Sequence, residues 1–304
     1  NVIMKRKVSL ALLFSGCLFF SAGSICRAAF ARADFGTRAV SMGEAFTAVA
    51  DDYSAMWWNP AGLYRLTFPQ LAMTGYSPYG MPIPTTFWAG VLPLSHGALG
   101  FDAAVRDFQE AAGFPFAEKA FGVSYGASAD VRLGGRKQTI LYGGRLSYYR
   151  FHLAAAEMQS EIRGVDLDFG AQVPLTPQLT LGIAARSLAS FHKGDKNQYD
   201  WEASAWFASN LTERLPRELS IGLSYAPDET TLVAFDLSKT DGMRQTYHLG
   251  LERIVADSLA LRAGCNNGQF SFGLGYLLRN WQLDFSYAFH ELQGTNQLTL
   301  SYVF

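Results

Sequence analysis

A two-residue alternation of apolar and polar side chains begins near Phe68 and continues to the C-terminus, and it constrains the fold more than any other feature. In the clearest example, Trp281, Leu283, Phe285 and Tyr287 alternate with polar or small residues. Successive side chains of a β-strand point to opposite faces, so each such segment predicts a strand with one apolar and one polar face. The pattern predicts about 14 strands, many close to the 9 to 11 residues that cross a bilayer at a tilt.

The connections between the predicted strands indicate a membrane barrel. Every second connection is tight, as at Leu94-Ser95-His96-Gly97, whereas those between them are mostly longer, and the longest covers residues 192–216. Short turns at one end and longer loops at the other are typical of outer-membrane barrels, and a soluble β-sandwich does not need that asymmetry. The sequence therefore predicts an all-β fold, a transmembrane antiparallel β-barrel of about 14 strands.

The polar face of the predicted strands carries charged side chains. A charge that faces lipid at the bilayer midplane costs about 2–4 kcal/mol, so these side chains should point into the lumen. They either line a transport path or form ion pairs that hold the barrel in shape, and for any single residue we favour the structural role. The residues expected in the lumen are Asp102, Arg106, Arg145, Asp166, Asp168, Arg186, Asp236, Glu252, Arg262 and Asp284.

The first 31 residues have the pattern of a secretory signal peptide. Residues 5–7 are basic, residues 8–22 are mostly apolar, and Ala29-Phe30-Ala31 is a small-x-small cleavage site. A transmembrane anchor is the alternative, but the apolar run is interrupted and shorter than a spanning helix needs. A lipoprotein signal is a weaker alternative, because the apolar run continues past Cys17.

Cleavage after Ala31 would lower the number of basic residues from 25 to 21 against 26 acidic ones, a net charge of about −5. This balance argues against binding to nucleic acid. Cleavage would also remove two of the three cysteines and leave Cys265. An intramolecular disulfide and a cysteine metal site are therefore excluded for the mature chain.

The stretch from Phe35 to Leu66 is the one part without strand alternation. Ala45, Val49 and Tyr53 recur at a helical spacing, which predicts an amphipathic helix or two short helical turns. Asn59-Pro60 ends the pattern, because the residue before a proline is disfavoured in a helix. We expect Asn59 to anchor this turn while Pro60, Ala61 and Gly62 reverse the chain into the first strand.

This stretch resembles the N-terminal signature of the FadL superfamily of outer-membrane transporters, and its PorV/PorQ-like branch most of all. The resemblance covers about a tenth of the chain. It implies that residues 32–66 form a plug, called the hatch, inside a barrel made by residues 67–304. The residues that carry it are Gly36-Thr37-Arg38-Ala39, Met42-Gly43-Glu44-Ala45-Phe46 and Trp58-Asn59-Pro60-Ala61-Gly62-Leu63.

The resemblance implies one of two functions. The first is transport of a hydrophobic, fatty-acid-like molecule across the outer membrane of a Gram-negative bacterium. The second, by likeness to PorV, is a surface scaffold that holds a secreted protein in type IX secretion. An aromatic-rich loop could receive either a hydrophobic ligand or a protein, and its candidate binding residues are Tyr199, Trp201, Trp206 and Phe207.

The final segment, Leu298–Phe304, resembles the C-terminal signal that the barrel-assembly machinery recognises in outer-membrane proteins. Its alternating apolar residues and terminal aromatic also predict a lipid-facing closing strand. We expect a monomer that contacts outer-membrane lipid. The five histidines are scattered and no catalytic motif occurs, so the chain is predicted to be no enzyme and to hold neither a metal nor a cofactor.

Overall fold

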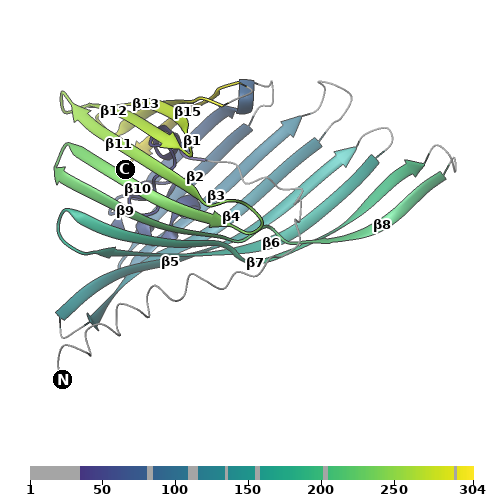
Figure 1. Ribbon diagram of the computed structural model, residues 1–304, viewed down its shortest axis with the longest axis horizontal. Coiled ribbons are helices and arrows are strands. Elements are labelled where there is room, and N and C mark those ends of the chain that lie inside the picture. The colour runs from purple at the N-terminus through teal and green to yellow at the C-terminus, as the bar shows by residue number, and fades with distance from the viewer. Residues whose placement is uncertain are drawn as a thin grey trace.

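The chain folds as one closed antiparallel sheet around a short N-terminal segment (Figure 1). The computed structural model describes residues 35–80, 85–108, 116–133, 136–154, 158–200, 205–290 and 293–304. The helical elements are α2 (Thr37–Ser41), α3 (Ala55–Trp58), η2 (Pro60–Arg65) and η3 (Pro78–Gly80). The strands are β1 (Gln70–Ser77), β2 (Thr85–Leu94), β3 (Gly97–Phe108), β4 (Phe116–Leu133), β5 (Arg136–Ala154), β6 (Met158–Pro174), β7 (Leu179–Asp200), β8 (Ala205–Glu213), β9 (Glu218–Asp228), β10 (Thr231–Thr240), β11 (Thr246–Val255), β12 (Leu259–Asn266), β13 (Gln269–Leu278), β14 (Trp281–Ala288) and β15 (Thr295–Val303).

Apart from β8 and β9, consecutive strands pair along the chain, and β1 pairs with β15 to close the sheet into a barrel. β8 and β9 share one position in the wall. The long strand β7 pairs with β9 through Leu179–Arg186 and with β8 through His192–Asp200. The fifteen strands therefore occupy 14 wall positions, and the predicted 14-stranded antiparallel barrel is confirmed.

The predicted loop over residues 192–216 is wrong. Strand β7 continues through most of the first half of this segment, to Asp200, and β8 returns beside it. The two strands form a long hairpin that extends past the neighbouring strands (Figure 1). Apolar and polar residues alternate along a strand when one of its faces lies in an apolar environment. Where a hairpin projects beyond the bilayer both faces meet polar surroundings, so the alternation fades although the strands stay paired.

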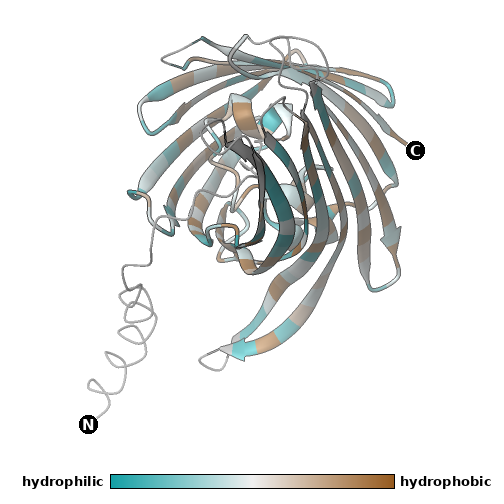
Figure 2. Ribbon diagram, turned by 90° about the vertical axis from the view of Figure 1, so that its right-hand side faces the viewer, coloured by the Kyte–Doolittle hydropathy of each residue, from teal (hydrophilic) through white to brown (hydrophobic). Residues whose placement is uncertain are grey.

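The two faces of the wall differ in polarity as the alternation predicts. Along β14, Leu283 and Phe285 are exposed on the outside, whereas Asp284 and Ser286 are buried inside. Brown and teal segments accordingly alternate along the strands in Figure 2. An apolar outer face of this kind suits the hydrocarbon of a bilayer. Of the described residues, no helix is both long enough and apolar enough to cross a membrane.

The C-terminal strand completes the wall. Leu298 and Leu300 are exposed on its outer face, and the N–H of Phe304 donates to the carbonyl of Pro69 at 3.0 Å. We call the end of the barrel that carries Phe304 the turn end. The opposite end, which carries the β7–β8 hairpin, is called the loop end.

The segment inside the barrel has little regular structure. The structure forms two short helical turns, α2 and α3, with irregular backbone between them, instead of one amphipathic helix over residues 45–57. Nearly all of its side chains are buried, because wall surrounds it on every side (Figure 2). We keep the name hatch for this segment, residues 35–66 of which are described.

Candidate functional site

The hatch divides the lumen, and its two halves contact different parts of the wall. α2 packs against β12 to β15, whereas η2 packs against β3 to β6. Phe35 lies toward the loop end, beside Tyr76 and Phe87 on the first two strands, and Leu66 leads out toward β1 at the turn end. The hatch therefore lies between the two ends of the lumen.

Asn59 ties the hatch to itself and to the wall. Its side-chain Oδ1 accepts from the N–H of Ala61 at 3.2 Å, which caps η2. Its Nδ2 donates to the carbonyl of Thr47 at 2.7 Å and to that of Ala171 on β6 at 3.1 Å. Irregular backbone at membrane depth needs partners of this kind, because no water of the bulk phase reaches it.

Gly62 permits a close approach within the hatch. A Cβ placed on this residue would lie 1.6 Å from the carbonyl oxygen of Ala50. The reversal predicted at Pro60-Ala61-Gly62 occurs as a 3-10 turn, and it also packs two hatch segments against each other.

Glycines on the inner face of the wall make room for the hatch, and sequence reasoning missed them. A Cβ on Gly264 would lie 2.0 Å from the backbone nitrogen of Gly43, and one on Gly170 would lie 1.9 Å from Oδ1 of Asn59. The sequence contained one indication of these glycines, since they fall on the polar face of their predicted strands. The other inner glycines that touch the hatch in this way are Gly100, Gly126, Gly143, Gly182, Gly250 and Gly273.

Gly264→Leu should displace the hatch from the wall, because the new side chain would occupy the space of the Met42–Gly43 backbone. We expect the hatch of this variant to be cut by protease added to the detergent-solubilised barrel, at least about ten times faster than in the wild type. Gly144→Leu is the matched control, since a Cβ there faces outward and makes only ordinary contacts, at 3.5 Å. Equal cleavage of the two variants would contradict a tightly seated hatch.

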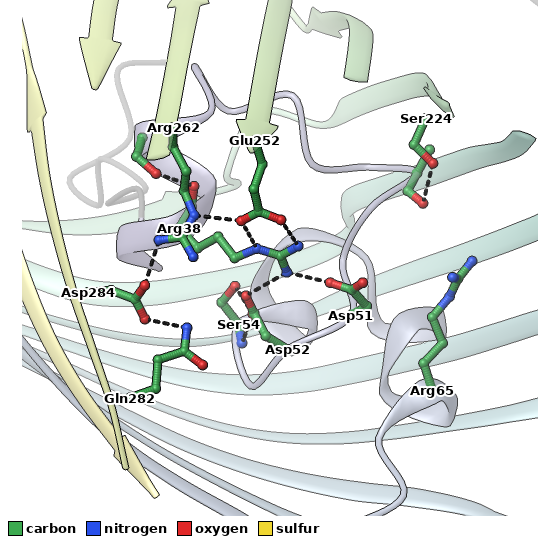
Figure 3. A network of polar contacts seen from close by, with 12 residues as sticks. Arg38, Asp51, Asp52, Ser54, Arg65, Ser224, Glu252, Arg262, Gln282 and Asp284 are labelled. Carbon is green, nitrogen blue, oxygen red and sulfur yellow. Dashed lines mark hydrogen bonds and ion pairs between the residues drawn. The ribbon is translucent and has the colours of Figure 1, made fainter. Parts of the chain in front are cut away.

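Arg38 links the hatch to the wall on the β11 side. Its guanidinium donates to both carboxylate oxygens of Glu252 at 2.8 Å, and to Asp51 at 2.5 Å within the hatch (Figure 3). Arg262 bridges Glu252 at 2.6 Å and Asp284 at 2.5 Å. Three of the predicted lumen charges thus meet in one network whose centre is Arg38, a hatch residue that the sequence named only as part of the N-terminal signature.

A cavity of about 290 Å³ borders this network at the turn end. Arg38, Asp51, Asp52 and Tyr53 line it from the hatch, and Glu252 is among the wall residues that complete it. Acidic side chains outnumber basic ones around the cavity, so its surroundings are polar and negative. The turn-facing side of the hatch is thus unsuited to an apolar ligand.

Arg145 forms the corresponding link on the β3–β6 side. It is fully buried, and its guanidinium donates to both oxygens of Asp102 at 3.0 and 2.7 Å. It also pairs with Asp168 at 3.5 Å. Its guanidinium carbon lies 4.4 Å from the ring centre of Trp57 in the hatch. The wall charge is therefore satisfied by carboxylates and covered by a hatch aromatic.

The other predicted lumen residues also lie inside the barrel. Asp236 accepts from the backbone N–H groups of Phe46 and Thr47 in the hatch at 2.9 and 2.8 Å. Arg186 pairs with Glu218 and lies over the ring of Trp58.

Asp166 and Asp168 bind Ser187, where β7 has a positive φ of 52° and its pairing with β6 shifts register. Arg106 pairs with Glu118 and donates to the hydroxyl of Tyr76.

Aromatic side chains cover the hatch on its loop-facing side. Phe35 stacks on Phe87 of β2 with ring centres 4.6 Å apart, and it meets Trp57 edge-on at 4.9 Å and Tyr76 at 5.8 Å. Phe35, Trp57 and Phe87 are almost fully buried. The two sides of the hatch differ sharply, with an aromatic cluster toward the loops and an ionic network toward the turns.

The predicted aromatic loop does not exist as a loop. Tyr199 pairs with Trp206, and Gln198 with Phe207, inside the β7–β8 hairpin. Trp201 lies outside the described residues. Among the residues that the structure covers, no group of three or more His, Cys, Asp or Glu side chains could hold a metal ion.

No protein-family model and no curated protein matches the sequence, so likeness to solved structures supplies the comparison. The CymD monoaromatic hydrocarbon channel shares 16% identity and a TM-score of 0.59, over 88% of this chain and 97% of that one. The chain shares the fold of FadL-type channels. The Ralstonia pickettii toluene transporter TbuX is 12% identical and a Pseudomonas aeruginosa FadL homologue 13%, each with a TM-score of 0.57 over 88% of this chain and 97% of theirs. The first of these three proteins is described as a channel and the second as a transporter.

Proposed function

We propose that the chain is an outer-membrane channel for small hydrophobic molecules, which enter at the loop end and pass the hatch. The observation that carries the proposal is the aromatic cluster of Phe35, Trp57 and Phe87 on the loop-facing side of the hatch. Aromatic faces offer a compact apolar ligand large contact areas without a need for hydrogen bonds. The apolar outer wall supports placement in an outer membrane, where closed barrels are found.

The fold relatives support the ligand class. Two of those named above are described as a monoaromatic hydrocarbon channel and a toluene transporter. Toluene and a fatty acid such as oleate are therefore the two probes of choice. We expect a Gram-negative host that lacks such channels to take up at least one labelled probe faster when it produces this protein. Equal uptake with and without the protein, for both probes, would refute the proposal.

Phe87→Ala should weaken binding of the transported probe about tenfold, because an aromatic contact contributes about 0.5–1.5 kcal/mol beyond its buried area. The dissociation constant in detergent solution, measured by titration calorimetry, tests this. Phe101→Ala is the control, since Phe101 is exposed on the outer face of β3. An unchanged dissociation constant in Phe87→Ala would place the ligand elsewhere.

A PorV-like surface scaffold is the second function that we consider, and one observation favours it. β8 pairs with β7 alone among the described strands, so its other edge is free to bind an extended segment of a secreted protein. Pro substitutions at Ser209 and Asn210 should then abolish capture of that protein while probe uptake stays normal. Loss of uptake without any change in capture would favour the channel.

A further inference from the structure

The outer face of the wall carries a row of four basic side chains near the loop end. Lys119 on β4 lies directly opposite Arg150 on β5, and Arg150 lies opposite Arg163 on β6. Arg163 in turn lies opposite Lys193 on β7. All four are exposed. We call these four residues the basic row.

Like charges directly across a sheet repel one another, so four in succession need a stabilising partner. Glu161 is one such partner, because its Oε1 lies 3.0 Å from the guanidinium of Arg150 and 2.6 Å from that of Arg163. In the described part of the chain, Lys119 and Lys193 form no salt bridge. One carboxylate thus serves two guanidinium groups, and the row retains a net positive charge.

A second row lies immediately below the basic row, toward the middle of the wall. Phe121, Tyr148, Val165 and Phe191 are also direct cross-strand neighbours, and each is exposed on the outer face. This apolar row is the edge of the lipid-facing belt. The basic row therefore lies where the hydrocarbon of a bilayer gives way to its head groups.

A polar groove adjoins the basic row and shows that the surface is hollowed there. It has a volume of about 670 Å³ and lies across β6, β7 and β8. Arg163 and Lys193 line one part together with the carboxylates of Glu161 and Asp195, and Asn210 and Thr212 line another. Arg163 and Lys193 can bind a phosphate, whereas the amide, the hydroxyl and the carboxylate of Asp195 can bind the hydroxyls of the same ligand.

We infer that the basic row and its groove bind the phosphorylated sugar head group of a glycolipid in the outer leaflet, with acyl chains against the apolar row. Neighbouring strands are about 4.8 Å apart, so the row spans about 14 Å, which is too wide for one phosphate and suits a sugar with a phosphate at each end. The inference rests on the proposed placement in an outer membrane, but not on which molecule passes through the barrel.

The test compares binding of three lipids to the full mature chain in phosphatidylcholine nanodiscs. The probes are diphosphorylated lipid A, the same lipid without phosphates, and phosphatidylglycerol, each counted by native mass spectrometry. We expect diphosphorylated lipid A to bind at least about tenfold more tightly than either of the others, and its binding to weaken as salt rises.

The variant K119Q/R150Q/R163Q/K193Q should bind diphosphorylated lipid A at least about 100-fold more weakly, since each charge near a membrane surface adds to the affinity. Its control, R132Q/K137Q/R253Q/R279Q, removes four exposed charges at the turn end and should bind normally. Should the first variant fail to fold, R163Q/K193Q alone is measured, with a loss of at least about tenfold expected.

Four outcomes would overturn the inference. They are equal binding by the two quadruple variants, equal binding of lipid A with and without phosphates, equal binding of phosphatidylglycerol, and binding of polyglutamate in preference to any lipid. Uptake of toluene or oleate by the basic-row variant separates this test from that of the channel. Normal uptake with lost lipid binding supports the inference, whereas lost uptake with normal lipid binding concerns the channel alone.

Discussion

Removal of Thr37–Ala55 should turn the closed barrel into an open pore. The deleted part includes α2, which fills the lumen beside β12 to β15, and it includes Arg38 at the centre of the ionic network. What remains on that side of the inner wall is a surface of small polar and charged residues, such as Thr299, Asp236 and Glu252. Water can fill the lumen beside such a surface, because a barrel of 14 strands encloses more space than its inward-facing side chains occupy.

Single-channel conductance in planar bilayers measures the effect. The wild type should conduct little, and the deletion should raise conductance at least about tenfold. Heat-modifiable migration in gels serves as the control that the deleted barrel is folded. A folded deletion variant with the conductance of the wild type would mean that the wall closes the lumen by itself, and the hatch would lose its role as a gate.

Arg145→Leu should lower the free energy of unfolding by about 3–5 kcal/mol, the usual cost of leaving one partner of a buried ion pair uncompensated. The two side chains in the pair are fully buried, and Asp102 would lose both of its bonds to the guanidinium. Loss of the contact with Trp57 adds to the effect. Urea unfolding of the barrel in lipid vesicles measures the change.

Two further variants show whether the cause is the unpaired carboxylate. Arg253→Leu removes an exposed arginine that pairs with an exposed Asp228, and it should cost less than about 1 kcal/mol. Arg145→Leu combined with Asp102→Asn should recover much of the lost stability, because the remaining amide carries no charge. A loss below about 1 kcal/mol in Arg145→Leu alone would show that water reaches this pair.

The barrel could be predicted from sequence because alternation along β14 and similar strands reports which face meets lipid. The inward direction of Asp102, Arg145 and Asp284 followed from the cost of the opposite direction. The hatch partner of Glu252 could not be predicted, since Arg38 lies 214 residues from it and nothing local couples the two. Pairing at that distance depends on how the closed wall brings strands around the hatch.

Two features escaped prediction for different physical reasons. Inner glycines such as Gly170 and Gly264 are small residues on a polar face, and only the position of the hatch shows that a methyl group does not fit. β8 lacks strong alternation because it lies beyond the apolar belt, so its pairing with β7 leaves no mark in hydropathy. Sequence therefore predicts best the parts of the chain that touch lipid.

The glycine contacts also lead to an expectation about the order in which the molecule is assembled. At Gly264 and Gly143 the wall backbone lies so close to the hatch backbone that a Cβ does not fit, so we expect the hatch to be in place before the barrel closes. Thr37 bonds Thr299 across a separation of 262 residues, so this contact waits for the last strand to be made. Contacts so distant in sequence form slowly. The seam between β1 and β15 should accordingly close late, around a hatch that already occupies the interior.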